Sequence, residues 1–143
     1  MLTVGLRVKK QMDNADKLAR ALEKDPHVIK VNYPTVEKYP QKELAKKLFK
    51  NSNMCGAMLS FEMPSDREKI NEFMKRLNIC HYAPTLGGVR TTMSHPATSS
   101  HRDLPEEMKK ALGITEGLMR ISVGIEEPED LIADFTQALK AFD

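Results

Sequence analysis

Residues 118–125 alternate between apolar and polar side chains. Such alternation predicts a β-strand, because successive side chains of a strand point to opposite faces of the sheet. One face of this strand is apolar and must cover a core: Met119, Ile121, Val123 and Ile125. The opposite face carries Arg120, Ser122 and Gly124. A guanidinium in mid-strand means that the second face of the sheet is not simple core.

Other strands and amphipathic helices interleave with this strand, without a fixed-period repeat. Segment 57–63 also alternates, with one strongly apolar face, and segment 27–33 is rich in β-formers. A turn is expected over 51–56, and apolar residues at helical spacing predict helices over 8–25, 44–49, 65–77, 105–112 and 128–142. Ser65 is the expected N-cap of the third helix, with Glu68 completing a capping box. The predicted fold class is α/β, or an α+β sandwich, in which helices pack on one sheet.

The composition is that of one soluble globular domain. A chain of 143 residues that is 41% hydrophobic and 29% charged can bury a single core. Two cysteines make no disulfide framework, and no apolar run approaches the roughly 18 residues of a spanning helix. We therefore expect a cytoplasmic protein without membrane contact.

The charges are unevenly distributed along the chain. Residues 1–50 hold 12 Lys or Arg against six Asp or Glu, whereas residues 51–143 hold 10 against 14. The basic part has few aromatic residues on which bases could stack. This pattern excludes a uniformly basic nucleic-acid binder, and we expect no nucleic-acid partner.

Two regions carry residues suited to chemistry. Arg120 could grip a carboxylate or phosphate bidentately, with Ser122 adding a neutral hydrogen bond. The alternatives for Arg120 are an exposed strand residue or an ion pair with an internal glutamate. The polar segment 80–103 is a candidate site loop, in which Gly87 and Gly88 permit a close backbone approach. The cysteine and histidines of this segment lack the spacing of a zinc site.

Several short segments together resemble a known family. They are VNYP (31–34), GAMLSF (56–61), TLGGV (85–89), HPA (95–97), LGITEGL (112–118) and RISVGIE (120–126). In this order they resemble the C-terminal domain of the Cys/Met-metabolism family of pyridoxal-phosphate (PLP) enzymes. That family includes cystathionine γ-synthase, cystathionine β- and γ-lyases and methionine γ-lyase. The resemblance covers essentially all 143 residues.

The resemblance implies a fold and a set of site residues. The fold is the small C-terminal domain of fold-type I PLP enzymes, a mostly antiparallel sheet with helices largely on one face and Arg120 on the other. Arg120 corresponds to the arginine that holds the substrate's α-carboxylate. Thr85 stands where the family usually has a serine beside the cofactor lysine, and Leu86 lines the same pocket. Ser100 falls in a segment near the substrate entrance.

The resemblance also implies what this chain lacks. The family's Schiff-base lysine lies in a Ser-x-Thr-Lys segment, and this sequence contains neither that segment nor a phosphate-binding glycine-rich loop. We therefore expect residues 1–143 to be a single substrate-orienting domain that binds no PLP and is inactive alone. Its expected partners are the missing PLP-binding large domain, the other subunits of a homotetramer, and a sulfur-containing amino acid. C–S lysis and γ-replacement on cystathionine, methionine or a homoserine ester all fit this half of the site.

Two other functions are compatible with the same residues. The chain could be a stand-alone module that binds an amino acid through Arg120 and Thr85. It could also be a protein-interaction module without catalysis, pairing through a sheet face or its first helix.

Overall fold

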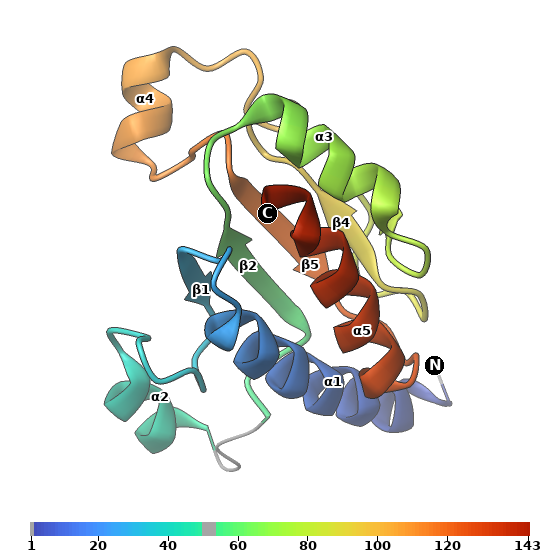
Figure 1. Ribbon diagram of the computed structural model, residues 1–143. Helices are drawn as coiled ribbons and strands as arrows, with labels where there is room; N and C mark the ends of the chain where they lie inside the picture. The colour runs from blue at the N-terminus through green and yellow to red at the C-terminus, as the bar shows by residue number, and fades with distance from the viewer. Residues whose placement is uncertain (1, 50–53) are drawn as a thin grey trace.

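The computed structural model describes residues 2–49 and 54–143, so part of the turn expected over 51–56 lies outside the described residues. Five strands form one sheet in the order β1-β2-β5-β4-β3 (Figure 1). The strands are β1 (Lys30–Asn32), β2 (Met58–Glu62), β3 (His81–Tyr82), β4 (Thr92–Ser94) and β5 (Leu118–Ser122). The helices are α1 (Val4–Lys24), α2 (Lys42–Leu48), α3 (Arg67–Arg76), α4 (Glu106–Ala111) and α5 (Pro128–Leu139), followed by a short 3₁₀ turn, η1 (Lys140–Phe142).

The sheet is mostly antiparallel, as expected. β2 pairs with β5 over its whole length, and β1–β2 and β4–β5 are also antiparallel. The one parallel pair among the described strands joins β3 to β4 at the edge of the sheet. The predicted α/β class is thus confirmed, with β5 at the centre of the sheet.

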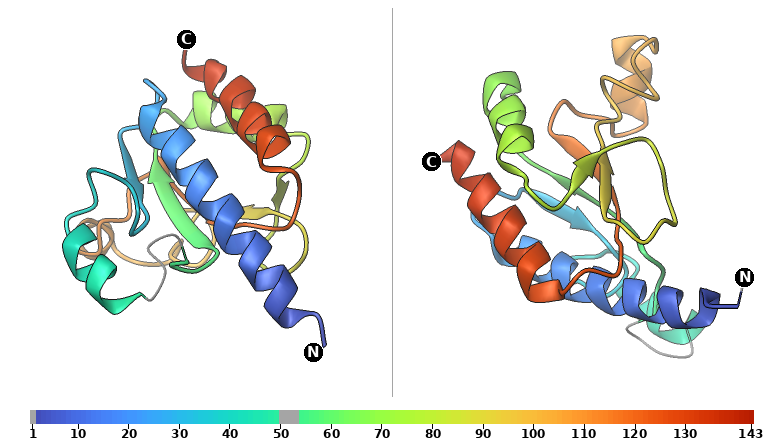
Figure 2. Two further views of the ribbon diagram at one scale, coloured as in Figure 1. Left: turned by 90° about the horizontal axis from the view of Figure 1, so that it is seen from below. Right: turned by 90° about the vertical axis from the view of Figure 1, so that its right-hand side faces the viewer.

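Helices α1, α3 and α5 cover one face of the sheet, while α2 and α4 lie at its margins (Figures 1 and 2). The inward side chains of β2 and β5, among them Phe61 and Ile121, are fully buried beneath these helices. Phe61 meets Phe73 of α3 and Phe135 of α5, with ring centroids 6.1 Å away in both cases. Edge contacts of this kind stabilise the core beyond what the buried apolar area of each ring contributes. None of the described helices is both long and apolar enough to cross a membrane.

Two strands are shorter than their sequence pattern predicts. The strand expected over 27–33 is reduced to β1, and a turn in which the Asp25 carboxylate accepts from the amide of His27 at 2.9 Å precedes it. The strand expected over 118–125 ends at Ser122. Ile125 was expected to face the core but is 37% exposed, since the chain has turned out of the sheet after Val123.

The N-cap of α3 also differs from the prediction by one residue. The cap is Asp66 rather than Ser65, and the Asp66 carboxylate accepts hydrogen bonds from the amides of Glu68 and Lys69, each at 3.1 Å. Aspartate is as good a cap as serine and carries a charge that suits the positive end of the helix. The helix expected over 105–112 is α4. Its expected end near residue 112 is confirmed, with Gly113 in the left-handed region at φ = 69°.

Candidate functional site

Arg120 lies on the face of the sheet that α1, α3 and α5 leave open. Its cross-strand neighbours are Ser60 on β2 and Ser94 on β4, and Asn32 on β1 extends the same row. The Asn32 amide donates to the Ser60 hydroxyl at 3.1 Å. A polar row therefore crosses four strands, and the guanidinium stands between two serines.

The guanidinium of Arg120 has no protein partner in the part of the chain that the structure describes. It makes no hydrogen bond or salt bridge with residues 2–49 or 54–143, although the residue is half-buried. The expected alternative of a pair with an internal glutamate is therefore absent from these residues. A half-buried, unpaired cation with hydroxyl groups on both sides is suited to binding an anion.

Ser122 lies one cross-strand row further along the same face of β5. Its hydroxyl is buried and accepts a hydrogen bond from the amide of Gly87 at 3.0 Å. Opposite it, the Thr92 hydroxyl donates to the carbonyl oxygen of Thr85 at 3.1 Å. The sequence suggested that Ser122 could add a neutral hydrogen bond to a ligand, and in the structure its hydroxyl oxygen also holds the loop.

The hydrogen bonds at Gly87 and Thr85 hold the loop between β3 and β4, residues 83–91 of the predicted segment 80–103, on the open face of the sheet. Rows on one face of a strand repeat about every 7 Å, so the loop lies roughly that far from the Arg120 row. The side chains of Thr85 and Leu86 are exposed there. Thr85 and Leu86 therefore belong to a loop whose backbone is held one row from Arg120, and their grouping with Arg120 in one site stays a prediction.

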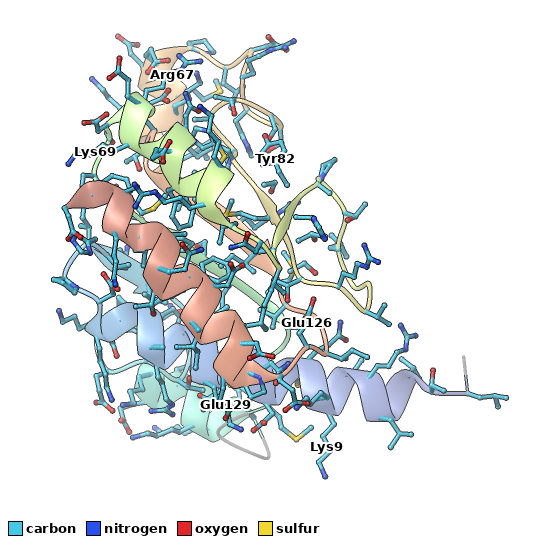
Figure 3. All side chains as sticks on the ribbon, turned by 45° about the vertical axis from the view of Figure 1, so that its right-hand side comes forward. Lys9, Arg67, Lys69, Tyr82, Glu126 and Glu129 are labelled. Atoms are coloured by element: carbon cyan, nitrogen blue, oxygen red, sulfur yellow. The ribbon has the colours of Figure 1, made fainter. Side chains whose placement is uncertain are left out.

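The far end of this loop is fixed to the segment that joins β5 to α5. Glu126 accepts hydrogen bonds from the amide of Thr91 at 2.6 Å and from its hydroxyl at 2.8 Å. Figure 3 labels Glu126 where the chain enters α5. A Cβ on Gly124 would lie 2.4 Å from the carbonyl oxygen of Val89, so only glycine permits this close approach. The end of the loop is therefore held by both a carboxylate and a backbone contact.

Ser100 lies in a separate turn between β4 and α4. Its hydroxyl bonds to Nδ1 of its neighbour His101 at 2.7 Å. The start of this turn is held by His95, whose Nε2 lies 2.6 Å from the carbonyl oxygen of Glu116. No hydrogen bond among the described residues joins Ser100 to Arg120 or Thr85.

Cysteine and metal-ligand chemistry are the other candidates for a functional site. Burial raises the pKa of the Cys80 thiol to about 12, with the Asp134 carboxylate adding to the effect. Among residues 2–49 and 54–143, no group of three or more His, Cys, Asp or Glu could hold a metal ion. Within the part of the chain that the structure describes, neither the buried Cys80 thiol nor a metal-binding cluster offers a second candidate site.

Sequence reasoning missed Ser60 and Ser94. The alternation of segment 57–63 does place Ser60 on the polar face, but nothing in the sequence says which residue of another strand lies opposite it. Ser94 belongs to a strand of only three residues, too short to show a period. The pairing with β5 is what makes both serines part of the site.

Comparisons with known proteins show that the sequence of this chain has relatives. Residues 1–140 match the family model described as Cys/Met metabolism PLP-dependent enzyme. An L-methionine gamma-lyase of Fusobacterium nucleatum subsp. polymorphum is 39% identical over 140 residues, which are 98% of this chain and 35% of that protein. A cystathionine gamma-lyase of Bacillus subtilis is 41% identical over 138 residues, 96% of this chain and 35% of that protein.

The fold has the same relatives. A crystal structure of an O-acetylhomoserine (thiol)-lyase from Campylobacter jejuni, which contains N'-pyridoxyl-lysine-5'-monophosphate, superposes with a TM-score of 0.89 at 36% identity. The match covers 96% of this chain and 32% of that chain. The chain therefore spans about a third of the length of the proteins that it matches.

Proposed function

Because the chain belongs to the family of Cys/Met metabolism PLP-dependent enzymes, we propose that residues 1–143 are the substrate-orienting domain of such an enzyme. In this role the domain holds the α-carboxylate of a sulfur-containing amino acid. The PLP-binding large domain is then the partner that completes the site. The length of the relatives supports this division, since this chain spans about a third of each.

The observation that carries the proposal is the guanidinium of Arg120, which has no partner within residues 2–49 and 54–143. A charge that is half-buried without a partner contributes little to folding, because desolvation is not repaid by an ion pair. A carboxylate bound bidentately would supply that pair, and Ser60 and Ser94 on the adjoining strands could add neutral hydrogen bonds. Arg120 is thus the residue to which we assign the binding of the substrate's α-carboxylate.

The other residues of the proposed site surround this contact. Thr85 and Leu86 are assigned to the substrate-facing side of the loop, a role supported by their exposure and by the bonds that hold the loop over the open face. Ser100 is assigned to the entrance, because it lies on an exposed turn that follows β4. These assignments follow the sequence resemblance residue by residue.

The residues around Arg120 fit a carboxylate better than they fit PLP. A Schiff base needs a lysine, and the cross-strand neighbours of Arg120 are both serines. Lys109 is the buried lysine of the described chain, and it is paired with Glu106 at 3.0 Å. We therefore assign the cofactor to the large domain and no step of its chemistry to this chain.

The reaction of the complete enzyme is proposed to be C–S lysis or γ-replacement. The names of the relatives support this class, since they include a methionine lyase and a cystathionine lyase. The proposed substrate is cystathionine, methionine or a homoserine ester. The sequence resemblance further supports a homotetramer as the complete assembly.

The carboxylate assignment is tested by titrating the isotope-labelled chain with L-methionine while the Arg120 Nε–Hε resonance is recorded by NMR. We expect this resonance to shift only at millimolar or higher ligand concentration, because a dissociation constant of 1 mM already corresponds to about 4 kcal/mol, which is more than one partly exposed ion pair supplies. L-methioninol, which lacks the carboxylate, is the matched ligand and should produce no shift. An Arg120→Met variant should also lose the binding.

Three results would contradict the proposal. An equal response to methioninol would show that the carboxylate is not what Arg120 recognises. Micromolar binding by this chain alone would instead support the stand-alone module. Borohydride trapping of PLP on one particular lysine would show that the chain holds the cofactor itself.

A further inference from the structure

Two consecutive glycines, Gly87 and Gly88, follow Thr85 and Leu86 in the loop beside the proposed binding site. Gly87 is in the left-handed region, at φ = 72°. Glycine loses more conformational freedom on ordering than any other residue. Two consecutive glycines on an exposed loop therefore need specific contacts to keep a single conformation.

Two buried side chains from distant elements supply those contacts. The Ser122 hydroxyl accepts from the Gly87 amide at 3.0 Å, and the Gln11 amide donates to the Gly88 carbonyl oxygen at 2.7 Å. Both side chains belong to residues that are only 3% exposed, although the glycines are exposed. Gln11 comes from α1 and Ser122 from β5, so the pair is held from a helix and from the sheet.

These two hydrogen bonds are not needed to close the loop. Its far end is already held by the Thr91–Glu126 bonds and by the Ile125 amide, which donates to the Val89 carbonyl oxygen at 2.9 Å. The Thr92 hydroxyl holds the carbonyl oxygen of Thr85, so the contacts at Gly87 and Gly88 instead fix the chain on the other side of Leu86. The loop of Thr85 and Leu86 is thus held over the row of Ser122 and Thr92, next to the row of Arg120.

We propose that Gln11 and Ser122 are positioning residues that fix Gly87–Gly88 and so set where Leu86 stands relative to the Arg120 guanidinium. By this means they determine which side chain an amino acid bound through its α-carboxylate can carry. The inference rests on the proposed function of Arg120. It adds that selectivity for a long apolar side chain depends on two residues that never touch the ligand.

The first test needs no ligand. The solvent-exchange rate of the Gly87 amide is measured by NMR in the full 143-residue chain and in three variants. Ser122→Ala should raise this rate about fivefold, as expected for one lost hydrogen bond, and Ser122→Thr, which keeps the hydroxyl, should restore it. Gln11→Met should raise the rate as well, because the glycine pair loses its second anchor.

Gln137→Met is the matched control for Gln11→Met. The Gln137 amide donates to the Arg76 carbonyl oxygen at 2.6 Å and to the Asp134 carboxylate at 3.3 Å, so the variant loses hydrogen bonds of the same kind away from Gly87 and Gly88. It should leave the exchange of the Gly87 amide unchanged. If Ser122→Ala leaves that exchange unchanged in a folded chain, the proposed clamp is wrong.

The second test measures selectivity. Dissociation constants for L-methionine and glycine are obtained from the Arg120 side-chain resonance, since both ligands carry the same carboxylate. Ser122→Ala and Gln11→Met should reduce the preference for methionine at least threefold while leaving the glycine constant unchanged. If a variant bound methionine and glycine more weakly by the same factor, the effect would be a general loss of stability, and the positioning role would be wrong. An unchanged preference for methionine would also overturn it.

The two tests separate this inference from the proposed function. If the unaltered chain shows no binding that depends on Arg120, the proposed function fails, and the selectivity role fails with it. The exchange test reports on the glycine clamp in either case. If binding depends on Arg120 but its selectivity does not depend on Ser122 or Gln11, only the further inference is refuted.

Discussion

Replacing Asp134 with asparagine removes a charge that three backbone amides share. The Asp134 side chain projects from α5 and is almost fully buried, and its two oxygens accept from the amides of Asn78 and Ile79 at 2.9 Å and of Cys80 at 3.2 Å. These contacts fasten the segment between α3 and β3 to α5. An asparagine side chain at this position would keep the shape but would offer only one acceptor oxygen.

The expected cost follows from these contacts. The asparagine NH₂ group must face at least one amide N–H, which leaves a buried donor unsatisfied at a cost of about 1–3 kcal/mol. The remaining bonds change from charged to neutral acceptors and lose roughly half their strength. We expect Asp134→Asn to lower the free energy of unfolding by about 2–4 kcal/mol at pH 7, measured by urea denaturation.

Asp66→Asn is the matched control. Asp66 also accepts two backbone amides, but it is an exposed N-cap, where asparagine performs as well as aspartate. We expect this change to cost less than about 0.5 kcal/mol. Equal costs for the two substitutions would refute the argument that the buried amides stabilise the Asp134 charge.

The pH dependence gives a second check. Burial acts to raise the pKa of Asp134, but the hydrogen bonds from Asn78, Ile79, Cys80 and Gln137 outweigh it and hold the pKa below its usual 3.8. A carboxylate with a lowered pKa in the folded state stabilises the protein above the unfolded pKa and loses this effect as the pH falls through the folded pKa. The difference between the original chain and Asp134→Asn should therefore be constant above about pH 5 and shrink below pH 3.8. A difference that persists undiminished at lower pH would contradict this assignment.

Three further predictions concern other parts of the molecule. Arg120→Met should change the free energy of unfolding by less than about 0.5 kcal/mol in urea, because the guanidinium has no partner among the described residues; a loss above about 2 kcal/mol would reveal a structural role. Gly117→Ala should cost about 3 kcal/mol or more in thermal denaturation, since the new Cβ would lie 1.8 Å from the carbonyl oxygen of Met63; an unchanged melting temperature would contradict this. Ellman's reagent should modify Cys80 only after urea is added, because burial raises the pKa of Cys80 to about 12 and the residue is only 4% exposed; native modification of Cys80 would show that its surroundings open.

Much of the fold could be predicted from local patterns. The alternation in segments 57–63 and 118–125 and the helical spacing of apolar residues are properties of neighbouring residues, so they placed β2, β5, α1 and α5 correctly. The ends of elements were less predictable. Asp66 rather than Ser65 caps α3, and Ile125 is exposed, because caps and strand ends depend on which amide or carbonyl group lies near in space.

The candidate site was predictable only in part. Arg120 could be assigned to the polar face of its strand from the sequence, and the loop with Thr85 and Leu86 could be selected from its composition and its resemblance. The buried clamps at Gln11 and Ser122 could not, because each joins residues far apart in the chain. Gln11 in particular is a polar residue on an amphipathic helix, and its sequence context gives no reason to expect it to be buried.

The sequence by itself determined that a strand runs through residues 118–122 and that its two faces differ in character, because side-chain direction along a strand depends only on local periodicity. It therefore also determined that Arg120 faces away from the core. Only the tertiary structure decided that this guanidinium stands between Ser60 and Ser94 rather than against a carboxylate. Strand order and register come from pairing between distant segments, and this long-range pairing leaves Arg120 on the open face of the sheet without a partner among the residues that the structure describes.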